Sequence, residues 1–383
     1  MTISQTAAAS PESLDLFAGE YSVAFNSTAT LSVNDGLEAR TNVAMSLSKP
    51  VTVGGNVVFR RGSSLTHAAH ASGDASQQKY AVNITSGGNV TVEPQVSVNV
   101  VSKGFAKQRG PGYNTSGANG PCVAHGGRRL GWKSGYSSAD CYGSILAPVT
   151  VGSGGYGISG GGAVKIAATG KISLGSNINA CGGSAQYAPS AGSVFLSCSR
   201  LEGTGSLYAY AANFNSSHAG SGGRIAVVQT TATDFSAWSG VADAHGAYSS
   251  DLSRWDKIGG AGTVYLKCAG SNGQVIVKNR VFLSEQETQI PMADDGNAAT
   301  AYADVDFLVP SNMTISLLGN TTIHDLDLKA TTSRLKLNGY TLTIKSGRHR
   351  DGKRWGAPYS SLVTEGGGTV VWIGKPGFLI SVH

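Results

Sequence analysis

Cysteine and charged residues are scarce in this chain of 383 residues. Only 14% of the residues are Asp, Glu, Lys or Arg, and there are five cysteines. No pair of cysteines has the CxxC spacing that is common in zinc sites, and an odd number argues against a dense disulfide framework. Cys122 and Cys141 bracket one loop. They can form a disulfide in an oxidising compartment, and two free thiols are the alternative.

Long apolar runs and several enzyme signatures are also missing. Because no stretch of eighteen apolar residues occurs, the sequence predicts no transmembrane helix. The first twenty residues, MTISQTAAASPESLDLFAGE, lack the basic start and apolar centre of a signal peptide. We therefore expect either the mature part of an exported protein or a protein that stays inside the cell. No phosphate-cradling loop, Ser-His-Asp signature or dinucleotide fingerprint is present.

Glycine is abundant, with 53 residues, and it marks an internal repeat. Four segments begin with glycine and then alternate apolar with other residues: GGAVKIAA (161–168), GSVFLSC (192–198), GRIAVVQ (223–229) and GTVYLKC (262–268). Aligned on the glycine, they place Val164, Val194, Ile225 and Val264 in one column, and Ile166, Leu196, Val227 and Leu266 in another. Cys198 and Cys268 then lie two repeats apart, too far for a disulfide.

Each repeat also contains a second candidate strand, and together the strands predict the fold. These segments are GKISLGSNINACGG, LEGTGSLYAYAAN, FSAWSGVADAHG and NGQVIVKN. Short alternating strands with glycine at the corners, repeating about every thirty residues, are typical of a single-stranded parallel β-helix, an all-β solenoid. We expect an N-terminal cap at residues 1–24, the β-helix at 25–330 with long loops near 104–148 and 230–261, and terminal coils with a C-terminal cap at 331–383.

The ordered set of motifs resembles a known class of protein. SSLTHA, YAVNITSGGNVTVEP, CYGSILAPVTVGSGG, AGSVFLSCSRLEGTGSL and GGAGTVYLK are similar to the glycine-rich β-strand-repeat modules of large bacterial secreted and surface proteins. The likeness covers roughly residues 60–280. It implies a secreted or cell-surface right-handed β-helix. It implies little about chemistry, since polysaccharide lyases, glycosidases, phage spikes and adhesins all use such folds.

The positive charge is concentrated in one segment. Residues 101–139 contain six basic and no acidic residues, and the remaining chain is balanced because 29 basic residues minus six equals the 23 acidic ones. The six are Lys103, Lys107, Arg109, Arg128, Arg129 and Lys133. Tyr113, Trp132 and Tyr136 lie among them. Guanidinium groups pair with carboxylates or sulfates, and aromatic rings stack on sugars. We interpret the segment as a polyanion-binding surface, with a solvated loop that aids solubility as the alternative.

The same segment could supply the groups for eliminative cleavage of a uronate polymer. This reaction needs a cation on the carboxylate, a base for the C5 proton and an acid for the leaving oxygen. Arg128 or Arg129 is the candidate cation, His125 or Lys133 the base and Tyr136 the acid; a loop histidine that is simply exposed is the alternative. Expected substrate-binding residues are Lys107, Arg109, Tyr113, Trp132, His245, Arg254, Trp255 and Lys257.

Hydrolysis and metal-assisted chemistry are the competing possibilities. A glycoside hydrolase needs two carboxyl groups, for which the candidates are Asp140, Glu202, Asp234, Asp243, Asp251 and Asp256. Calcium could use the acids of ADDGN (293–297) or ADVDF (303–307), but neither has the spacing of a known Ca²⁺ loop. We therefore expect no metal and no cofactor, with Ca²⁺ as the alternative.

These patterns favour an extracellular carbohydrate-active protein that acts on an acidic or sulfated polysaccharide. A β-elimination lyase is the first prediction and a glycoside hydrolase the second. A non-catalytic glycan-binding adhesin or a structural surface module is the alternative. No nucleic-acid-binding module is visible, so we expect neither nucleic acid nor membrane insertion. The sequence does not indicate an oligomeric state.

Overall fold

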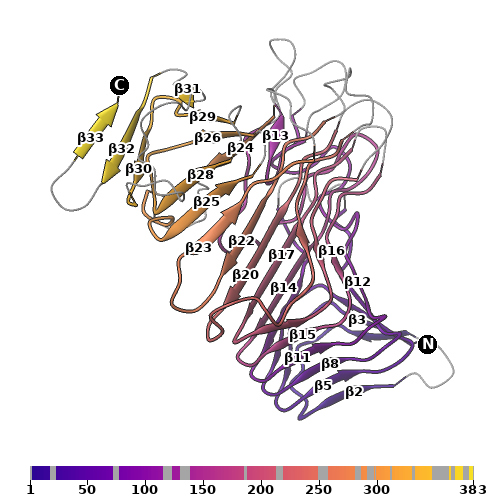
Figure 1. The fold of residues 1–383 in the computed structure, drawn as a ribbon. Coiled ribbons are helices and arrows are strands. Elements are labelled where there is room, and N and C mark those ends of the chain that lie inside the picture. Colours follow the sequence, from indigo (N-terminus) through magenta and orange to yellow (C-terminus); the bar gives the residue numbers. More distant parts are fainter. Residues whose placement is uncertain are drawn as a thin grey trace.

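The computed structural model of the chain is built from strands joined by turns and loops, with no helix in the residues that it describes (Figure 1). These residues are 2–17, 23–71, 77–114, 123–129, 139–184, 188–212, 219–248, 258–280, 286–290, 297, 299–310, 313–329, 333–346, 362–363, 367–373 and 379–382.

Three long sheets form most of the molecule, and we call them A, B and C. Sheet A consists of β1 (Thr2–Gln5), β3 (Val23–Ser27), β6 (Val43–Leu47), β9 (Ser64–Thr66), β12 (Ser97–Asn99), β16 (Ile178–Asn179), β19 (Leu207–Tyr208) and β21 (Ala242–Asp243). Sheet C consists of β2 (Leu14–Leu16), β5 (Leu37–Ala39), β8 (Val57–Phe59), β11 (Val90–Val92), β15 (Ile172–Leu174) and β18 (Leu201–Gly203). All strand pairs within these two sheets are parallel.

Sheet B runs along the whole stack. Its strands are β4 (Leu31–Val33), β7 (Val51–Val53), β10 (Val82–Ser86), β14 (Ala163–Ala168), β17 (Ser193–Cys198), β20 (Arg224–Gln229), β22 (Thr263–Lys267), β23 (Gly273–Ile276), β25 (Val305–Val309) and β28 (Asp325–Leu328). From β4 to β19 the chain visits sheets B, C and A in turn, one strand in each, except for β13 (Arg128–Arg129), which joins another sheet. The expected all-β, parallel architecture is therefore present.

The strand register confirms the two columns predicted from the repeats. Val164 pairs with Val194, which pairs with Ile225, which pairs with Val264. The glycine that opens each repeat lies where neighbouring turns touch. A Cβ atom on Gly192 would lie 1.8 Å from the Gly162 carbonyl oxygen, so no side chain fits there.

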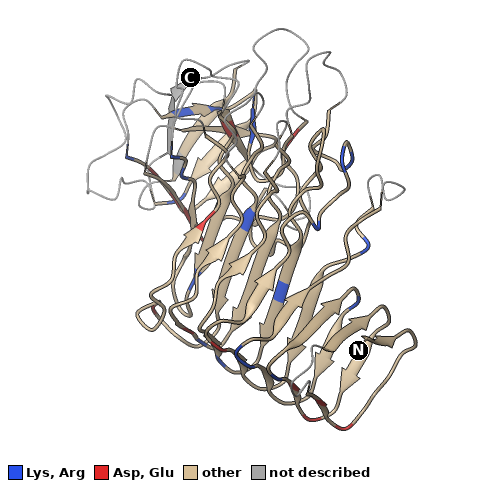
Figure 2. Cartoon of the chain, turned by 90° about the vertical axis from the view of Figure 1, so that its right-hand side faces the viewer, with Lys and Arg blue, Asp and Glu red and all other residues tan. Residues whose placement is uncertain are grey.

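Charged residues gather along one edge of the strand stack, and few strand residues elsewhere are charged (Figure 2). Asp15 pairs with Arg40 at 2.8 Å, and Arg60 reaches both Glu38 and Glu93 at 2.8 Å. Such exposed pairs contribute little stability individually. Their position shows that much of the charge in the N-terminal half is neutralised locally.

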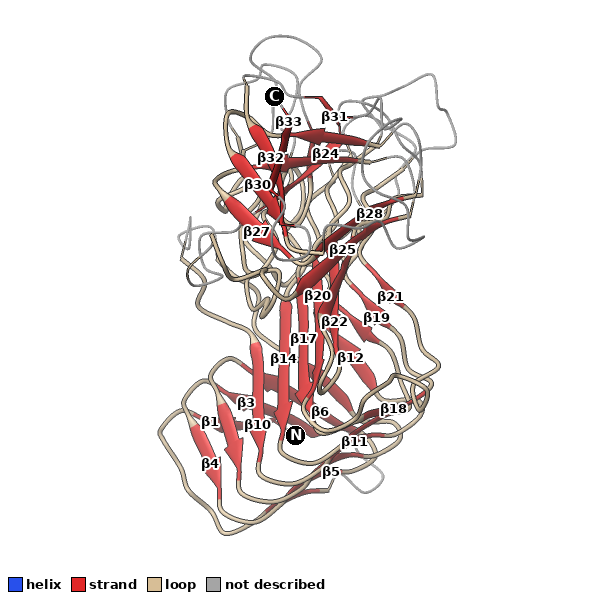
Figure 3. Ribbon diagram, turned by 60° about the vertical axis from the view of Figure 1, so that its left-hand side comes forward, coloured by secondary structure: helices blue, strands red, loops and turns tan. Residues whose placement is uncertain are grey.

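Two smaller sheets, D and E, form the end of the molecule farthest from β1 (Figure 3). Sheet D consists of β13 (Arg128–Arg129), β24 (Gln286–Ile290), β26 (Thr314–Leu317), β29 (Arg334–Lys336) and β31 (Leu362–Val363). Sheet E consists of β27 (Thr321–Ile323), β30 (Thr341–Ile344), β32 (Thr369–Ile373) and β33 (Leu379–Val382).

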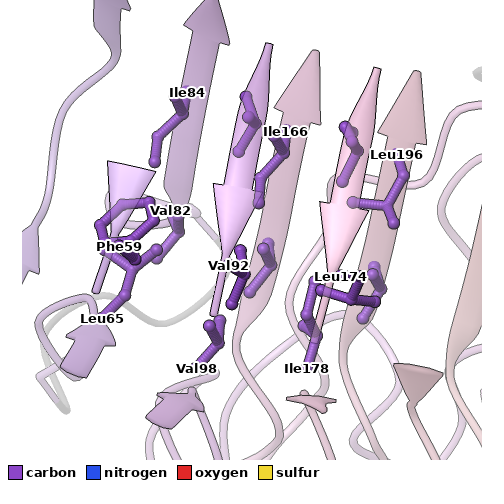
Figure 4. Packing of buried hydrophobic residues seen from close by; sticks show 14 of the residues in the cluster. Phe59, Leu65, Val82, Ile84, Val92, Val98, Ile166, Leu174, Ile178 and Leu196 are labelled. Carbon is purple, nitrogen blue, oxygen red and sulfur yellow. The ribbon is translucent and has the colours of Figure 1, made fainter. Parts of the chain in front are cut away.

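Inward side chains of sheets A, B and C meet in one apolar core. Phe59, Leu65 and Ile84 come from sheets C, A and B respectively and are buried together (Figure 4). A second core lies between the later strands and includes Phe307 and Leu317. Burial on alternate positions is the direct result of the period-2 apolar pattern.

The prediction of one uninterrupted series of coils is wrong after β22. The segment NGQVIVKN forms β23, which turns back and pairs antiparallel with β22 instead of lying on β21. A short turn at Gly270, with φ of +68°, allows this reversal, and Gly273 leaves room for the Tyr265 ring. Strands β23, β25 and β28 remain in sheet B, so the regular order of parallel coils ends near residue 273, and the expected boundary at 331 stays a prediction. At the other end, residues 2–16 already supply strands β1 and β2.

The described parts of the two expected long loops, 104–148 and 230–261, contain only the two-residue strands β13 and β21. Cys141, Cys181, Cys198 and Cys268 are free thiols, and Cys122, the other member of the expected pair, lies outside the described residues. Gln229 separates Cys198 from Cys268, since it pairs with Cys198 in the sheet and its Nε2 donates to Cys268 Sγ at 3.4 Å.

Candidate active site at the last strand of sheet A

The basic segment does not form an exposed cationic surface at Arg128 and Arg129. These residues make up β13, which pairs antiparallel with β24, a strand 157 or more residues further along the chain. The Arg128 guanidinium contacts the carboxylates of Glu287 and Asp140, the latter at 2.6 Å. Because the Glu287 side chain is only 2% exposed, this ion pair satisfies a buried charge. The expected role of Arg128 as a cation for substrate is therefore wrong.

His125 is a core residue and not a loop base. Its Nδ1 donates to the carbonyl oxygen of Ala191 at 2.6 Å, and its Nε2 lies 2.9 Å from the Thr150 hydroxyl. The ring stacks on Tyr142 with centroids 4.5 Å apart. Burial, with a smaller effect from Arg224, lowers the pKa of His125 to about 3. Both ring nitrogens are occupied, so the prediction that His125 abstracts a proton is corrected.

The remaining predicted residues are scattered or lie beyond the described part of the chain. Arg129 is buried, Tyr113 is half-buried, and Lys107 and Arg109 are exposed. Lys133, Tyr136, Trp132, Arg254, Trp255 and Lys257 lie outside the described residues. The described members of the predicted catalytic set, His125, Arg128 and Arg129, are buried or nearly so. Of the predicted residues that the structure describes, His245 is the one that lines a cavity together with other chemically active side chains.

This cluster is created by the register of sheet A. Asn179, Tyr208 and Asp243 pair with one another and form one outward column. Beyond the strand ends, Ala211 N donates to the His245 carbonyl oxygen and Gly182 N to that of Tyr210. Parallel pairing thus places Cys181, Tyr210 and His245 in the next outward column. The Tyr210 and His245 rings stack at 4.8 Å with an interplanar angle of 12°, which matches the spacing of neighbouring strands.

Asp243 orients the imidazole ring of His245. Its Oδ1 accepts from His245 Nδ1 at 2.7 Å and from the His245 backbone N at 3.2 Å. In neighbouring strands Asn99 and Asn179 make the same turn contact to the backbone N two residues later. Asparagine thus suffices for the turn, and the aspartate adds a charge that holds Nδ1 as the donor. The Nε2 lone pair then points away, and no described residue hydrogen-bonds to Nε2.

A cation and two tyrosine rings complete the cluster. Arg280 Nη2 lies 3.4 Å from Asp243 Oδ2, and Arg280 Nη1 donates to the Tyr248 hydroxyl at 3.1 Å. The Tyr248 and His245 ring centroids are 6.0 Å apart. Burial acts to raise the pKa of Asp243, but the hydrogen bonds and charge of His245, with the charge of Arg280, bring it below its usual value. Asp243 is therefore an anion at neutral pH.

The cluster forms part of the rim of a cavity of about 480 Å³ at the open edge of β21. The residues that line it include the apolar Trp238, Val264 and Ile276 and a polar group, which we call the rim, of Asp243, His245, Lys278 and Arg280. Apolar surface can support the C–H face of a sugar, and the rim can bind its polar groups. Among the described residues Asp243 is the one carboxylate that lines this cavity.

Two features of the cluster could have been found from the sequence. YAY (208–210) and DAH (243–245) each place an alanine between two larger side chains, and both lie in the second strand of their repeats. The contribution of Lys278 and Arg280 could not be found this way, because it depends on the reversal at β23. Two of the acids considered for calcium are described, and each forms its own ion pair. Asp306 contacts His324 at 2.6 Å, and Asp304 contacts Lys345 at 3.0 Å.

Comparison of the chain with protein families, with curated proteins and with solved structures finds no match. The described residues contain no group of three or more His, Cys, Asp or Glu side chains arranged to hold a metal ion. They also contain no helix with the length and apolar character needed to cross a membrane.

Replacement of Arg128 tests the assignment of β13 to the folded core. The Arg128→Ala variant leaves Glu287 buried without its guanidinium partner, so we expect a loss of about 3 kcal/mol in the free energy of unfolding. Urea denaturation measures this value, and Lys107→Ala, an exposed residue of the same basic segment, should change it by less than about 0.5 kcal/mol. If the Arg128→Ala protein is fully stable but binds anionic polymers less well, the result would support the prediction that Arg128 belongs to a polyanion-binding surface.

Burial of His125 predicts how the stability of the fold depends on pH. The pKa of His125 in the folded protein, about 3, lies below its unfolded value of about 6.5, so the unfolded state binds the proton more readily. The contribution of neutral His125 to the free energy of unfolding should therefore be fully present above pH 6.5 and decrease as the pH drops towards 3. NMR titration should show a neutral His125 ring at pH 5. A ring that titrates near pH 6.5 would show that His125 is exposed.

Proposed function

We propose that this chain is a right-handed parallel β-helix that cleaves an acidic polysaccharide by β-elimination, with His245 as the base. The regular succession of strands through sheets B, C and A supports the β-helix. The resemblance of residues 60–280 to glycine-rich repeat modules of bacterial secreted and surface proteins supports the same fold and an extracellular location. The contact between Asp243 and His245 at the rim of a cavity carries the functional proposal.

The chemistry follows from the groups at the rim. Arg280 pairs with the uronate carboxylate and stabilises the charge that develops when the C5 proton leaves. His245 Nε2 takes that proton, the C–H electrons form a double bond between C4 and C5, and the C4–O bond breaks. The Tyr248 hydroxyl, which accepts from Arg280, gives its proton to the departing oxygen. Proton return from His245 through water restores both groups.

Elimination fits the described rim better than hydrolysis does. A glycoside hydrolase needs a second carboxyl group at a defined distance from the first. Asp243 is the one described carboxylate at the cavity, and it is engaged with His245 and Arg280. Asp251 and Asp256, two of the other hydrolytic candidates, lie outside the described residues.

A binding module without chemistry is the second candidate. The His245 side chain is only 3% exposed, and it lies between the rings of Tyr210 and Tyr248. A base so enclosed needs the substrate to enter the cavity, whereas an adhesin needs only the exposed Arg280 and Lys278. In that case Asp243 and His245 would hold the last strand of sheet A in place.

Variants of the rim separate the two candidates. With uronate polymers as substrates, formation of unsaturated ends is followed by ultraviolet absorbance. His245→Gln should reduce kcat/KM by about a hundredfold or more, because the base is lost. Asp243→Asn should cost about tenfold, since asparagine keeps the turn contact but not the charge. Arg280→Ala should mainly raise KM.

The matched control is Asp234→Asn, which removes an exposed carboxylate at another corner and should leave kcat/KM unchanged. Unchanged cleavage by the His245→Gln enzyme would contradict the catalytic assignment. Absence of cleavage of every uronate polymer, together with retention that depends on Arg280, would identify the chain as a binding module.

A further inference from the structure

The outer face of sheet A is almost uncharged. Along each strand the inward positions are apolar or buried and the alternate positions point outward. The outward residues of the eight strands are Thr2, Ser4, Ala24, Asn26, Ala44, Ser46, Ser64, Thr66, Ser97, Asn99, Asn179, Tyr208 and Asp243. Asp243 is the single charged residue among them. This face leads directly to the cavity rim.

A second hollow of about 450 Å³ lies on this face. Its lining includes Ser97, Asn99, Ser176, Asn177 and Asn179. β12, which carries Asn99, lies three strands from β21, a separation of about 14 Å at the usual strand spacing. Tyr208 lies between Asn179 and Asp243 in the same column. An extended chain of a few sugars can therefore span both hollows.

The amide groups in this hollow are held in place by the backbone. Asn99 Oδ1 accepts from Val101 N at 3.0 Å, and Asn179 Oδ1 accepts from Cys181 N at 3.1 Å. The oxygen of each amide is thus used, and no described residue accepts a hydrogen bond from either Nδ2. Two oriented donors remain for a ligand. Such donors suit the hydroxyl and ring oxygens of sugars, whereas repeated carboxylates on this face would lose water without gaining a cation.

We infer that the polysaccharide is a heteropolymer that is neutral over β12, β16 and β19 and carries its carboxylate in the unit at Arg280 and Lys278. This inference rests on the proposed function and specifies its substrate class. Among the described residues of the site, the positive groups lie at the cavity rim, while the neighbouring strands offer amides, hydroxyls and one tyrosine ring. A polymer charged at every sugar does not match that distribution.

Binding to two polymers as a function of salt tests the inference. Gellan has one glucuronate among neutral sugars in each repeat, and polygalacturonate is charged at every unit. We expect gellan to bind about tenfold tighter at physiological salt, with the weak salt dependence of one or two ion contacts. Tighter binding of polygalacturonate with a steep salt dependence would overturn the inference.

A single substitution probes the neutral hollow itself. Asn179→Asp keeps the turn contact, as Asp243 does in the same column, but replaces the amide donor with a negative charge. Affinity for gellan should fall about tenfold, the effect of losing one good hydrogen bond. The control Asn83→Asp makes the same change on the outer face of sheet B and should leave affinity unchanged.

The outcomes separate this inference from the proposed function. Cleavage of polygalacturonate that is insensitive to Asn179→Asp would overturn the inference and leave the catalytic proposal standing. Binding of gellan that is weakened by Asn179→Asp, without cleavage of any polymer, would support the inference and contradict the catalytic proposal.

Discussion

Parallel, in-register pairing is the interaction on which the rest of this structure depends. Every residue of a strand lies directly beside its counterpart in the strands before and after it, about 4.8 Å away. Residues that are far apart in sequence therefore form straight columns. The same pairing stacks Val164 on Val194 in the core and Tyr208 beside Asp243 on the surface. The core between sheets A, B and C and the stacking of Tyr210 on His245 are consequences of this one geometric rule.

The repeats made much of the fold predictable. Glycine followed by alternating apolar residues determined both the strands and the register of β14, β17, β20 and β22, because only glycine fits where successive turns touch. The same alignment could have located Tyr210 beside His245. Local pattern was enough in these cases, since each residue meets the residue one repeat away.

Contacts that cross the repeats could not be predicted in this way. The basic residues Arg128 and Arg129 looked unpaired because residues 101–139 contain no acidic residue, yet Glu287 neutralises Arg128 from 159 residues away. The reversal at β23 likewise brings Arg280 to the end of sheet A and begins a second core. A count of local charge therefore indicated a polyanion surface where the folded chain has an internal ion pair.

The central claim is that ligand contacts follow the outward columns of sheet A to Asp243 and avoid the basic segment. Hydrogen–deuterium exchange with and without a bound acidic heteropolysaccharide tests this most directly. The account predicts added protection in residues 97–101, 177–182, 206–212 and 241–246, with none in 103–109 or 123–129. Protection confined to 103–109 and 123–129, with sheet A unchanged, would contradict it.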